Sequence, residues 1–287
     1  MSTTPPPPSA TGNGPDAAGP TGPAGADAPV VLVSGAARGI GAATARHLAR
    51  DGWRVALLDG ATPEPALGYA LSSADELHRT VATCGPDAFG VVADVRDQAA
   101  LDAAVSQVVD RFGRLDAVVS AAGAIAGGAT VWETGDDVWD AMVDINLTGP
   151  FRLVRAAVPH LLARPAPRQG RVVVIASAAS VGGLPRLGAY SAAKHGVIGL
   201  VRSLAVELAP AGITANAVCP GSTRTTMLEA SAAVYDLDSV EVFAGQQPVG
   251  RLLEPEEIAA AVAWLCQPAA AGVTGAVLPV DGGMTAS

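Results

Sequence analysis

VVLVSGAARGIGAATARHLA, residues 30–49, joins an apolar run to a glycine-rich turn and then to an alanine-rich segment. The run that ends at Ser34 predicts a buried strand, and the segment after Gly41 predicts a helix. Gly35, Gly39 and Gly41 fall in the turn between them, where glycines let backbone N–H groups approach a pyrophosphate at the positive end of a helix. A glycine-rich turn without any ligand would have the same pattern, so the rest of the chain must decide between the two.

Beyond this turn, short valine-rich runs alternate with longer segments rich in Ala and Leu. Such alternation is typical of strands joined by crossover helices. Most of the runs are apolar at every position, as expected of parallel strands covered on both faces. We therefore predict an α/β fold for residues 29–287: a single Rossmann-type, doubly wound parallel sheet of about seven strands with helices on both faces. The predicted strands are VVLVS (30–34), RVALLD (54–59), FGVVAD (89–94), DAVVSA (116–121), RVVVIAS (171–177), ITANAV (213–218) and AVLPVD (276–281).

The composition restricts the partners and the compartment. Residues 1–28 are mostly Pro, Gly, Ala and Thr and predict a disordered tail. The formal charge of −9 would repel nucleic acids and anionic membranes, so a small molecule is the expected partner. Cys84, Cys219 and Cys266 are far apart, which predicts buried thiols rather than a disulfide or a metal site. No apolar run could span a membrane and no signal peptide is recognisable, so we expect a soluble, cytoplasmic protein.

Two charged residues bear on the choice of nucleotide. Asp59 ends the second predicted strand, where a carboxylate can accept hydrogen bonds from the adenosine ribose and would repel a 2′-phosphate. Arg38 lies inside the glycine-rich turn and could pair with the 2′-phosphate of NADP. We predict NAD, because a phosphate held against a carboxylate is costly to bury, and keep NADP as the alternative. A plain turn beginning at Asp59 would explain that residue without a nucleotide.

Lys194 is the only lysine of the chain, and it follows Tyr190 by four residues in AYSAAKHG (189–196). On the long helix predicted there, both side chains leave the same face. A nearby ammonium lowers the pKa of a phenol, so Lys194 is predicted to make Tyr190 a usable general base. Ser177 ends the fifth predicted strand, where its hydroxyl could polarise a substrate oxygen. Taken singly, these residues could be a solvated charge, a surface aromatic and a helix cap. Together, behind a dinucleotide loop, they favour catalysis.

Several motifs, in order, resemble the short-chain dehydrogenase/reductase family from about Val30 to Met284: SGAARGIG (34–41), INLTG (145–149), YSAAK (190–194), CPGSTRTTM (219–227) and VDGG (280–283). The resemblance implies that Asn146 completes a catalytic tetrad with Ser177, Tyr190 and Lys194 and helps to hold a proton-relaying water. It also implies that Asp94 and Val95 flank the adenine and that Thr225 contacts the nicotinamide carboxamide. The predicted cofactor-binding residues are Gly35, Arg38, Gly39, Ile40, Gly41, Asp59, Asp94, Val95, Gly123, Tyr190, Lys194, Pro220, Gly221, Thr223 and Thr225.

Ordinary structural roles stay open for three of these residues. Asn146 could bridge backbone groups, Asp94 could cap the helix that begins near Gln98, and Thr225 could begin the next helix. The chain also has SAAG at 120–123 where relatives usually carry NNAG. We expect the missing Asn side chains to loosen a structural contact there, while the glycine still allows a close approach of the cofactor.

Residues 60–80 form an insertion that looks like the one in short-chain dehydrogenases associated with mycofactocin, a peptide-derived redox carrier. The resemblance implies an NAD that stays bound and passes its electrons to mycofactocin. An insertion directly after Asp59 would lie near the adenine and ribose, and could act as a lid on the cofactor. A surface excursion without function is the alternative.

These observations predict an NAD-dependent alcohol dehydrogenase in which Tyr190 takes the hydroxyl proton while a hydride goes to the nicotinamide. Residues 226–248 should cover the substrate, a secondary alcohol or ketone on a hydrophobic body. The rivals are an NADP-dependent carbonyl reductase of the same fold and a non-catalytic dinucleotide sensor. We also predict a homotetramer, because the helices expected at about 136–163 and 189–210 are richer in apolar residues than one sheet face can cover.

Overall fold

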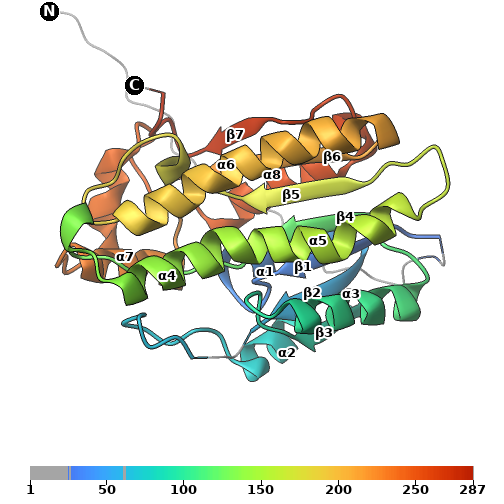
Figure 1. The fold of residues 1–287 in the computed structure, drawn as a ribbon, viewed down its shortest axis with the longest axis horizontal. Coiled ribbons are helices and arrows are strands. Elements are labelled where there is room, and N and C mark those ends of the chain that lie inside the picture. Colours follow the sequence, from blue (N-terminus) through green and yellow to red (C-terminus); the bar gives the residue numbers. More distant parts are fainter. Residues whose placement is uncertain (1–24, 26, 61–62, 287) are drawn as a thin grey trace, which may run out of the picture.

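Parallel strands form the centre of the fold in the computed structural model, which describes residues 25, 27–60 and 63–286 (Figure 1). Within these residues the sheet has the order β3-β2-β1-β4-β5-β6-β7, so the chain winds outward in both directions from its middle. This confirms the predicted fold class, although the predicted disorder of residues 1–28 lies almost entirely outside the described residues. The strands are β1 (Val30–Ser34), β2 (Arg54–Asp59), β3 (Ala88–Val92), β4 (Ala117–Ser120), β5 (Arg171–Ile175), β6 (Thr214–Pro220) and β7 (Val277–Val280).

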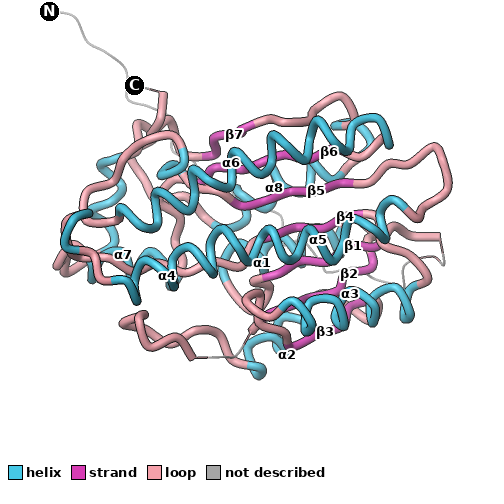
Figure 2. The backbone as a smooth tube through the Cα atoms, in the orientation of Figure 1, coloured by secondary structure: helices cyan, strands magenta, loops and turns pink. Residues whose placement is uncertain are grey.

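Helices cover both faces of the sheet, as predicted (Figure 2). One face packs against α3 (Gln98–Phe112), α5 (Gly149–Leu162) and α6 (Gly188–Leu208). The other packs against α1 (Gly39–Arg50), α2 (Ala74–Thr83) and α8 (Pro255–Cys266). Alternate residues of each strand face opposite layers, which is why the strands are apolar at nearly every position. Among the described residues, none of the helices has the length and apolar character that crossing a bilayer requires.

Shorter elements surround the carboxyl ends of the strands. α4 (Asp136–Val143) continues through a π-helical turn, η2 (Asp144–Thr148), into α5, so the helix predicted at 136–163 is one helical stretch with a local widening. α7 (Thr226–Val234) and the 3-10 helix η5 (Val240–Gln246) make up most of the predicted substrate cover. The 3-10 turns η1 (Val131–Glu133) and η3 (Ala178–Ser180) follow β4 and β5, whereas η4 (Ala209–Ala211) and η6 (Pro268–Ala270) precede β6 and β7 at the amino ends of the strands.

The predicted insertion at 60–80 divides into two parts. Residues 63–73 are irregular, and α2 then begins at Ala74 because Ser73 and Glu76 form a capping box. Leu77 of α2 is buried in the core, so the helical part belongs to the sheet's covering layer and not to an excursion. The irregular part, light blue in Figure 1, lies at the end of the molecule where α4 and α7 are found.

Candidate active site

A cavity of about 260 Å³ lies at the carboxyl ends of the strands. Turns that follow six neighbouring strands converge on it, as expected at the point where a doubly wound sheet changes direction. Every predicted site residue lines this cavity except Asn146. The lining residues at or just after the strand ends include Gly35, Asp59, Asp94, Gly123, Ser177 and Gly221.

The glycine-rich turn leaves the beginning of α1 open to the cavity. No side chain caps this helix, so its first N–H groups point to the space where a pyrophosphate would lie. A Cβ on Gly41 would lie 2.1 Å from the carbonyl oxygen of Gly35, so only glycine fits there. The uncapped, side-chain-free cradle fits the diphosphate of a dinucleotide.

Asp59 lies at the end of β2 beside this cradle. Its Oδ2 accepts a hydrogen bond from Ala37 N at 2.8 Å, and its Oδ1 accepts one from the hydroxyl of Ser72, a residue of the insertion. Burial raises the pKa of the Asp59 carboxyl, and the hydrogen bond from Ser72 opposes that shift. Each carboxylate oxygen has a second lone pair, so the carboxylate can still accept from ribose hydroxyls.

Arg38 turns its guanidinium toward the insertion and α2. Its Nη2 donates to Ala70 O at 2.9 Å, and its Nη1 lies 3.8 Å from a carboxylate oxygen of Glu76. Arg38 therefore has protein partners for its charge, and its presence in the glycine-rich turn does not require a phosphate of NADP.

Tyr190 and Lys194 lie on α6 and are both buried at the cavity. Burial raises the pKa of Tyr190 to about 12, and a hydrogen bond with Ser177 partly opposes this. Burial also lowers the pKa of Lys194 to about 8. The Lys194 Nζ lies 5.8 Å from the centre of the Tyr190 ring and donates to Ile175 O at 2.9 Å. The pKa of Tyr190 is therefore raised and not lowered as we expected, with burial as the largest cause.

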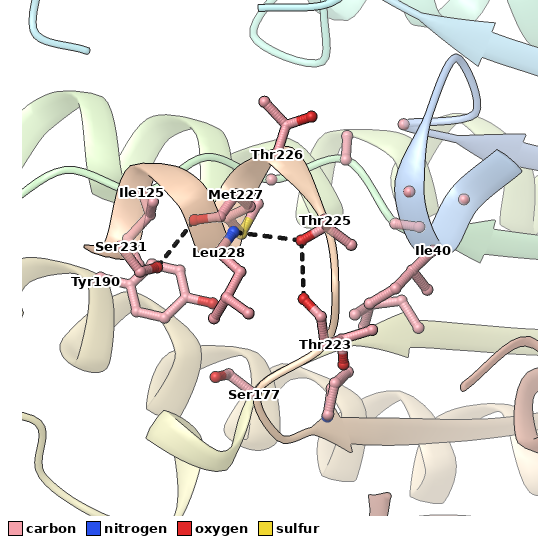
Figure 3. A pocket seen from close by; sticks show the side chains of 18 of the residues that line it. Ile40, Ile125, Ser177, Tyr190, Thr223, Thr225, Thr226, Met227, Leu228 and Ser231 are labelled. Atoms are coloured by element: carbon pink, nitrogen blue, oxygen red, sulfur yellow. Dashed lines mark hydrogen bonds between the residues drawn. The ribbon is translucent and has the colours of Figure 1, made fainter. Parts of the chain in front are cut away.

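Ser177 follows β5 and is oriented by the turn that it begins. Its Oγ accepts a hydrogen bond from Ala179 N at 3.1 Å, while Ser180 Oγ accepts from Ser177 N at 3.1 Å. The backbone thus uses a lone pair of Ser177, while the hydroxyl proton is directed to Tyr190 across the cavity and can turn to a substrate oxygen. Figure 3 shows the hydroxyls of Ser177 and Tyr190 directed into the same space.

Asn146 lies in the π-helical turn, fully buried and behind the cavity wall. Its side chain donates to Ala124 O at 2.9 Å and Met142 O at 3.1 Å and accepts from Ala124 N at 3.2 Å. Asn146 therefore bridges backbone groups, which is the structural role left open by the sequence. A Cβ on Gly123 would lie 3.1 Å from Asn146 Oδ1 and 3.7 Å from Lys194 Nζ, so Asn146 still adjoins the reacting end of the cavity.

We expected the SAAG turn after β4 to be loosened by the missing Asn side chains, but Ser34 holds this turn by other hydrogen bonds. Ser34 Oγ accepts hydrogen bonds from Ala121 N at 3.2 Å and Ala122 N at 3.3 Å. A serine at the end of β1 therefore holds the backbone of this turn to the neighbouring strand.

The other predicted contacts combine cavity lining with structural roles. Thr225 caps α7, since its Oγ1 accepts from Leu228 N at 3.3 Å, as the structural alternative predicts. Asp94 does not cap α3, because Asp97 does so; Asp94 instead forms an ion pair with Arg96, whose Nη2 lies 2.7 Å from its Oδ2. Both Thr225 and Asp94 keep their place in the lining, and their roles toward a cofactor remain predictions.

Sequence reasoning missed the residues of the insertion that reach the cavity. Tyr69, Leu71 and Ser72 line it, and Glu64 forms an ion pair with Arg96 beside Asp94. The hydroxyl of Tyr69 accepts a hydrogen bond from Ile125 N at 3.0 Å. The partners are backbone and side-chain groups distant in sequence, and no local pattern signals such a contact.

Comparisons with known proteins agree with this geometry. A family profile described as enoyl-(acyl carrier protein) reductase matches residues 35–285. (−)-trans-Carveol dehydrogenase of Rhodococcus erythropolis is 37% identical over 271 residues, which cover 89% of this chain and 97% of that protein.

Two solved structures have the same fold. Carveol dehydrogenase from Mycobacterium avium in complex with NAD has a TM-score of 0.85 and 35% identity, and the match covers 92% of this chain and 100% of that one. An actinorhodin polyketide ketoreductase with NADPH has a TM-score of 0.79 and 35% identity, covering 91% and 98%. A profile match over most of the chain, together with relatives above 30% identity along nearly their whole length, shows that this chain belongs to the short-chain dehydrogenase/reductase family of oxidoreductases.

Proposed function

We propose that the protein is an NAD-dependent dehydrogenase that oxidises a secondary alcohol to a ketone, or performs the reverse reduction. Ser177 donates its hydroxyl proton to the substrate oxygen and holds it beside Tyr190. Tyr190 takes the alcohol proton as the carbon–hydrogen bond breaks. NAD, when bound, would supply the acceptor for the hydride, and its positive charge would favour the phenolate form of Tyr190 that can take the proton. The observation that carries the proposal is the meeting of Ser177, Tyr190 and Lys194 in a cavity that also contains an uncapped helix N-terminus.

Lys194 and Asn146 lie next to the reacting end of the cavity and are proposed to assist the reaction. The side-chain nitrogen of Lys194 adjoins the phenol, and its bond to Ile175 O fixes its position. As a neutral amine it can receive the proton that Tyr190 has taken, and as an ammonium it can return one. Asn146 fixes the loop after β4 to the helix behind the cavity. We assign the proton relay to Lys194, with Asn146 as the residue that holds the cavity wall beside it.

NAD is favoured over NADP by the contacts of two residues. Asp59 places a carboxylate where a 2′-phosphate would lie, and Arg38, the nearest candidate phosphate ligand, already contacts Ala70 and Glu76. The name of the NAD-bound relative from Mycobacterium avium supports the same choice. Val95, Thr223 and Pro220, which also line the cavity, are proposed to complete the cofactor's surroundings.

The substrate end of the cavity is apolar, which favours an alcohol on a hydrophobic body. Residues 226–248 supply much of this end, and Lys194 is the only charged side chain among the described residues that line it. The other charged lining residues, Arg38, Asp59, Asp94 and Arg96, lie at the ends of β1, β2 and β3, toward the adenine. Apolar lining residues at the substrate end include Ile125, Leu184, Leu187, Met227, Leu228 and Phe243.

Replacing Tyr190 by Phe tests the proposed reaction. The change removes only the ionisable hydroxyl, so kcat should fall by at least about 100-fold while bound NAD per subunit is unchanged. Tyr235→Phe, at another tyrosine of the same cavity, is the matched control and should keep most activity. A Tyr190→Phe variant within about tenfold of wild type, or about 1.4 kcal/mol of barrier, would contradict the role of Tyr190.

We propose further that NAD stays bound between turnovers and that mycofactocin reoxidises it, as the resemblance of the insertion implies. The insertion contacts three places around the expected adenosine: Ser72 at Asp59, Ala70 at Arg38 and Glu64 at Arg96. Releasing the nucleotide would require these contacts to break together. We place this reaction in the cytoplasm, a reducing compartment that suits three buried cysteines without a disulfide between them.

A further inference from the structure

The insertion reaches beyond the adenosine to the opposite end of the cavity. Tyr69 packs against the cluster that contains Ile125, Met142 and Tyr190, whereas its neighbours Ala70 and Ser72 contact Arg38 and Asp59. Figure 3 shows Ile125 and Tyr190 at one end of the pocket and Ile40, on the glycine-rich turn, at the other. Tyr69 thus belongs to the wall around the substrate, although it comes from a segment next to the cofactor.

Two tyrosines line this end besides Tyr190, and their hydroxyl groups are used differently. Tyr235 donates its proton to Pro185 O at 2.8 Å. Tyr69 instead accepts a hydrogen bond, from Ile125 N at 3.0 Å, and its own proton has no acceptor among the residues that the structure describes. A phenol has one proton to donate, so the donor of Tyr235 is satisfied and that of Tyr69 is available to a ligand in the cavity. Burial raises the pKa of Tyr69, so the proton is retained at neutral pH.

We propose that Tyr69 is a specificity-determining residue that donates a hydrogen bond to a second, uncharged oxygen of the substrate, apart from the reacting hydroxyl. This inference rests on the proposed alcohol oxidation. The acceptor is an ether, carbonyl or hydroxyl oxygen, because the positive charges near Tyr69 are already in use: Arg38 contacts Ala70 O and Glu76, and Lys194 belongs to the catalytic group. The preferred substrate is therefore an apolar secondary alcohol or ketone with one further oxygen.

Matched substrate pairs test this role. The probes are 3- and 4-methoxycyclohexanol and, as near-isosteres without the acceptor, 3- and 4-ethylcyclohexanol, assayed with dichlorophenolindophenol to reoxidise bound nucleotide. We expect wild type to have the higher kcat/KM for at least one methoxy compound over its ethyl partner. Tyr69→Phe should shift that ratio about tenfold toward the ethyl compound, since a site built to bond an oxygen discriminates by that bond.

Tyr235→Phe is the matched control, because its lost bond goes to the protein. It should leave the methoxy-to-ethyl ratio within twofold of wild type. Loosening of the insertion, through loss of the bond from Ile125 N, would lower both rates together and leave the ratio unchanged. An unchanged ratio in Tyr69→Phe, an equal shift in Tyr235→Phe, or no preference for any methoxy compound in wild type would each overturn the proposal. A wild type that oxidises none of the four alcohols would contradict the dehydrogenase function itself, and this role with it.

Discussion

At the scale of single residues, Lys194 combines function with a cost in stability. Its buried ammonium has a pKa lowered to about 8 from 10.5, so below pH 8 the charged folded form is disfavoured relative to the unfolded chain by about 3 kcal/mol. The penalty disappears as the pH rises from 8 to 10.5, because the lysine then loses its proton in both states.

We therefore expect Lys194→Met to abolish activity yet raise the stability of the nucleotide-free protein at pH 7. The net gain should be about 2 kcal/mol, since the bond to Ile175 O, worth about 1 kcal/mol, is lost with the charge. Denaturant unfolding at pH 7 and at pH 10 measures the difference, which should be smaller at the higher pH. A variant less stable than wild type at pH 7 would show that the ammonium is not strained by burial.

Asp59 is expected to set the choice of nucleotide. Asp59→Ala removes the carboxylate that a 2′-phosphate would meet and frees Ala37 N to bind an anion. The ratio of kcat/KM for NAD to that for NADP should fall by about tenfold or more, measured in a variant that exchanges its cofactor. Asp59→Asn keeps the shape of the side chain but not its charge. It therefore distinguishes repulsion of the 2′-phosphate by the carboxylate from exclusion by the size of the side chain. A wild type that already prefers NADP would show that Arg38 decides instead.

Much of the site could be predicted from the sequence because its residues follow the strands in a fixed order. Ser177, Tyr190 and Lys194 were identified by strand end and helical spacing, and all three line the cavity. The pKa of Tyr190 could not be predicted, because burial is a property of the packed site. Tyr69 could not be found either, since its partner, Ile125 N, is a backbone group with no sequence signature.

At the scale of elements, the strands were predictable and the insertion was not. Apolar runs of four to seven residues fit only a sheet covered on both faces. The insertion ends where the chain rejoins the core at Leu77, and whether Leu77 is buried cannot be read from the neighbouring residues alone. The structure places that boundary at the capping box of Ser73 and Glu76.

Replacing residues 63–71 by a short glycine linker should release the cofactor while keeping α2. Wild type is expected to purify with about one NAD per subunit, to turn over poorly with free NAD alone, and to recover with dichlorophenolindophenol. The shortened variant should lose NAD on dialysis and depend on added NAD. A deletion extended to residue 78 removes Leu77 from the core and should destabilise the fold. Steady release of free NADH by wild type without an acceptor would contradict cofactor retention.

At the scale of the whole molecule, we predict a homotetramer assembled through α5 and α6. Val206 on α6 is 77% exposed, and Phe151 on α5 is 43% exposed. Light scattering at micromolar concentration should give about four times the subunit mass of 28.5 kDa. Val206→Arg with Phe151→Arg should give smaller species, whereas Val92→Arg, at a 54% exposed position on β3, should not. A stable wild-type monomer would contradict the prediction.

The contacts of the insertion with both ends of the cavity also bear on what drives the reaction. An enzyme that keeps one dinucleotide per subunit is insulated from mass action by the free NAD and NADH of the cell. Its direction is then governed by the reduction potential of the acceptor that reoxidises it, relative to that of the alcohol and ketone. If NAD is retained as we propose, each subunit stores two electrons, and a cell rich in NADH can still oxidise the alcohol.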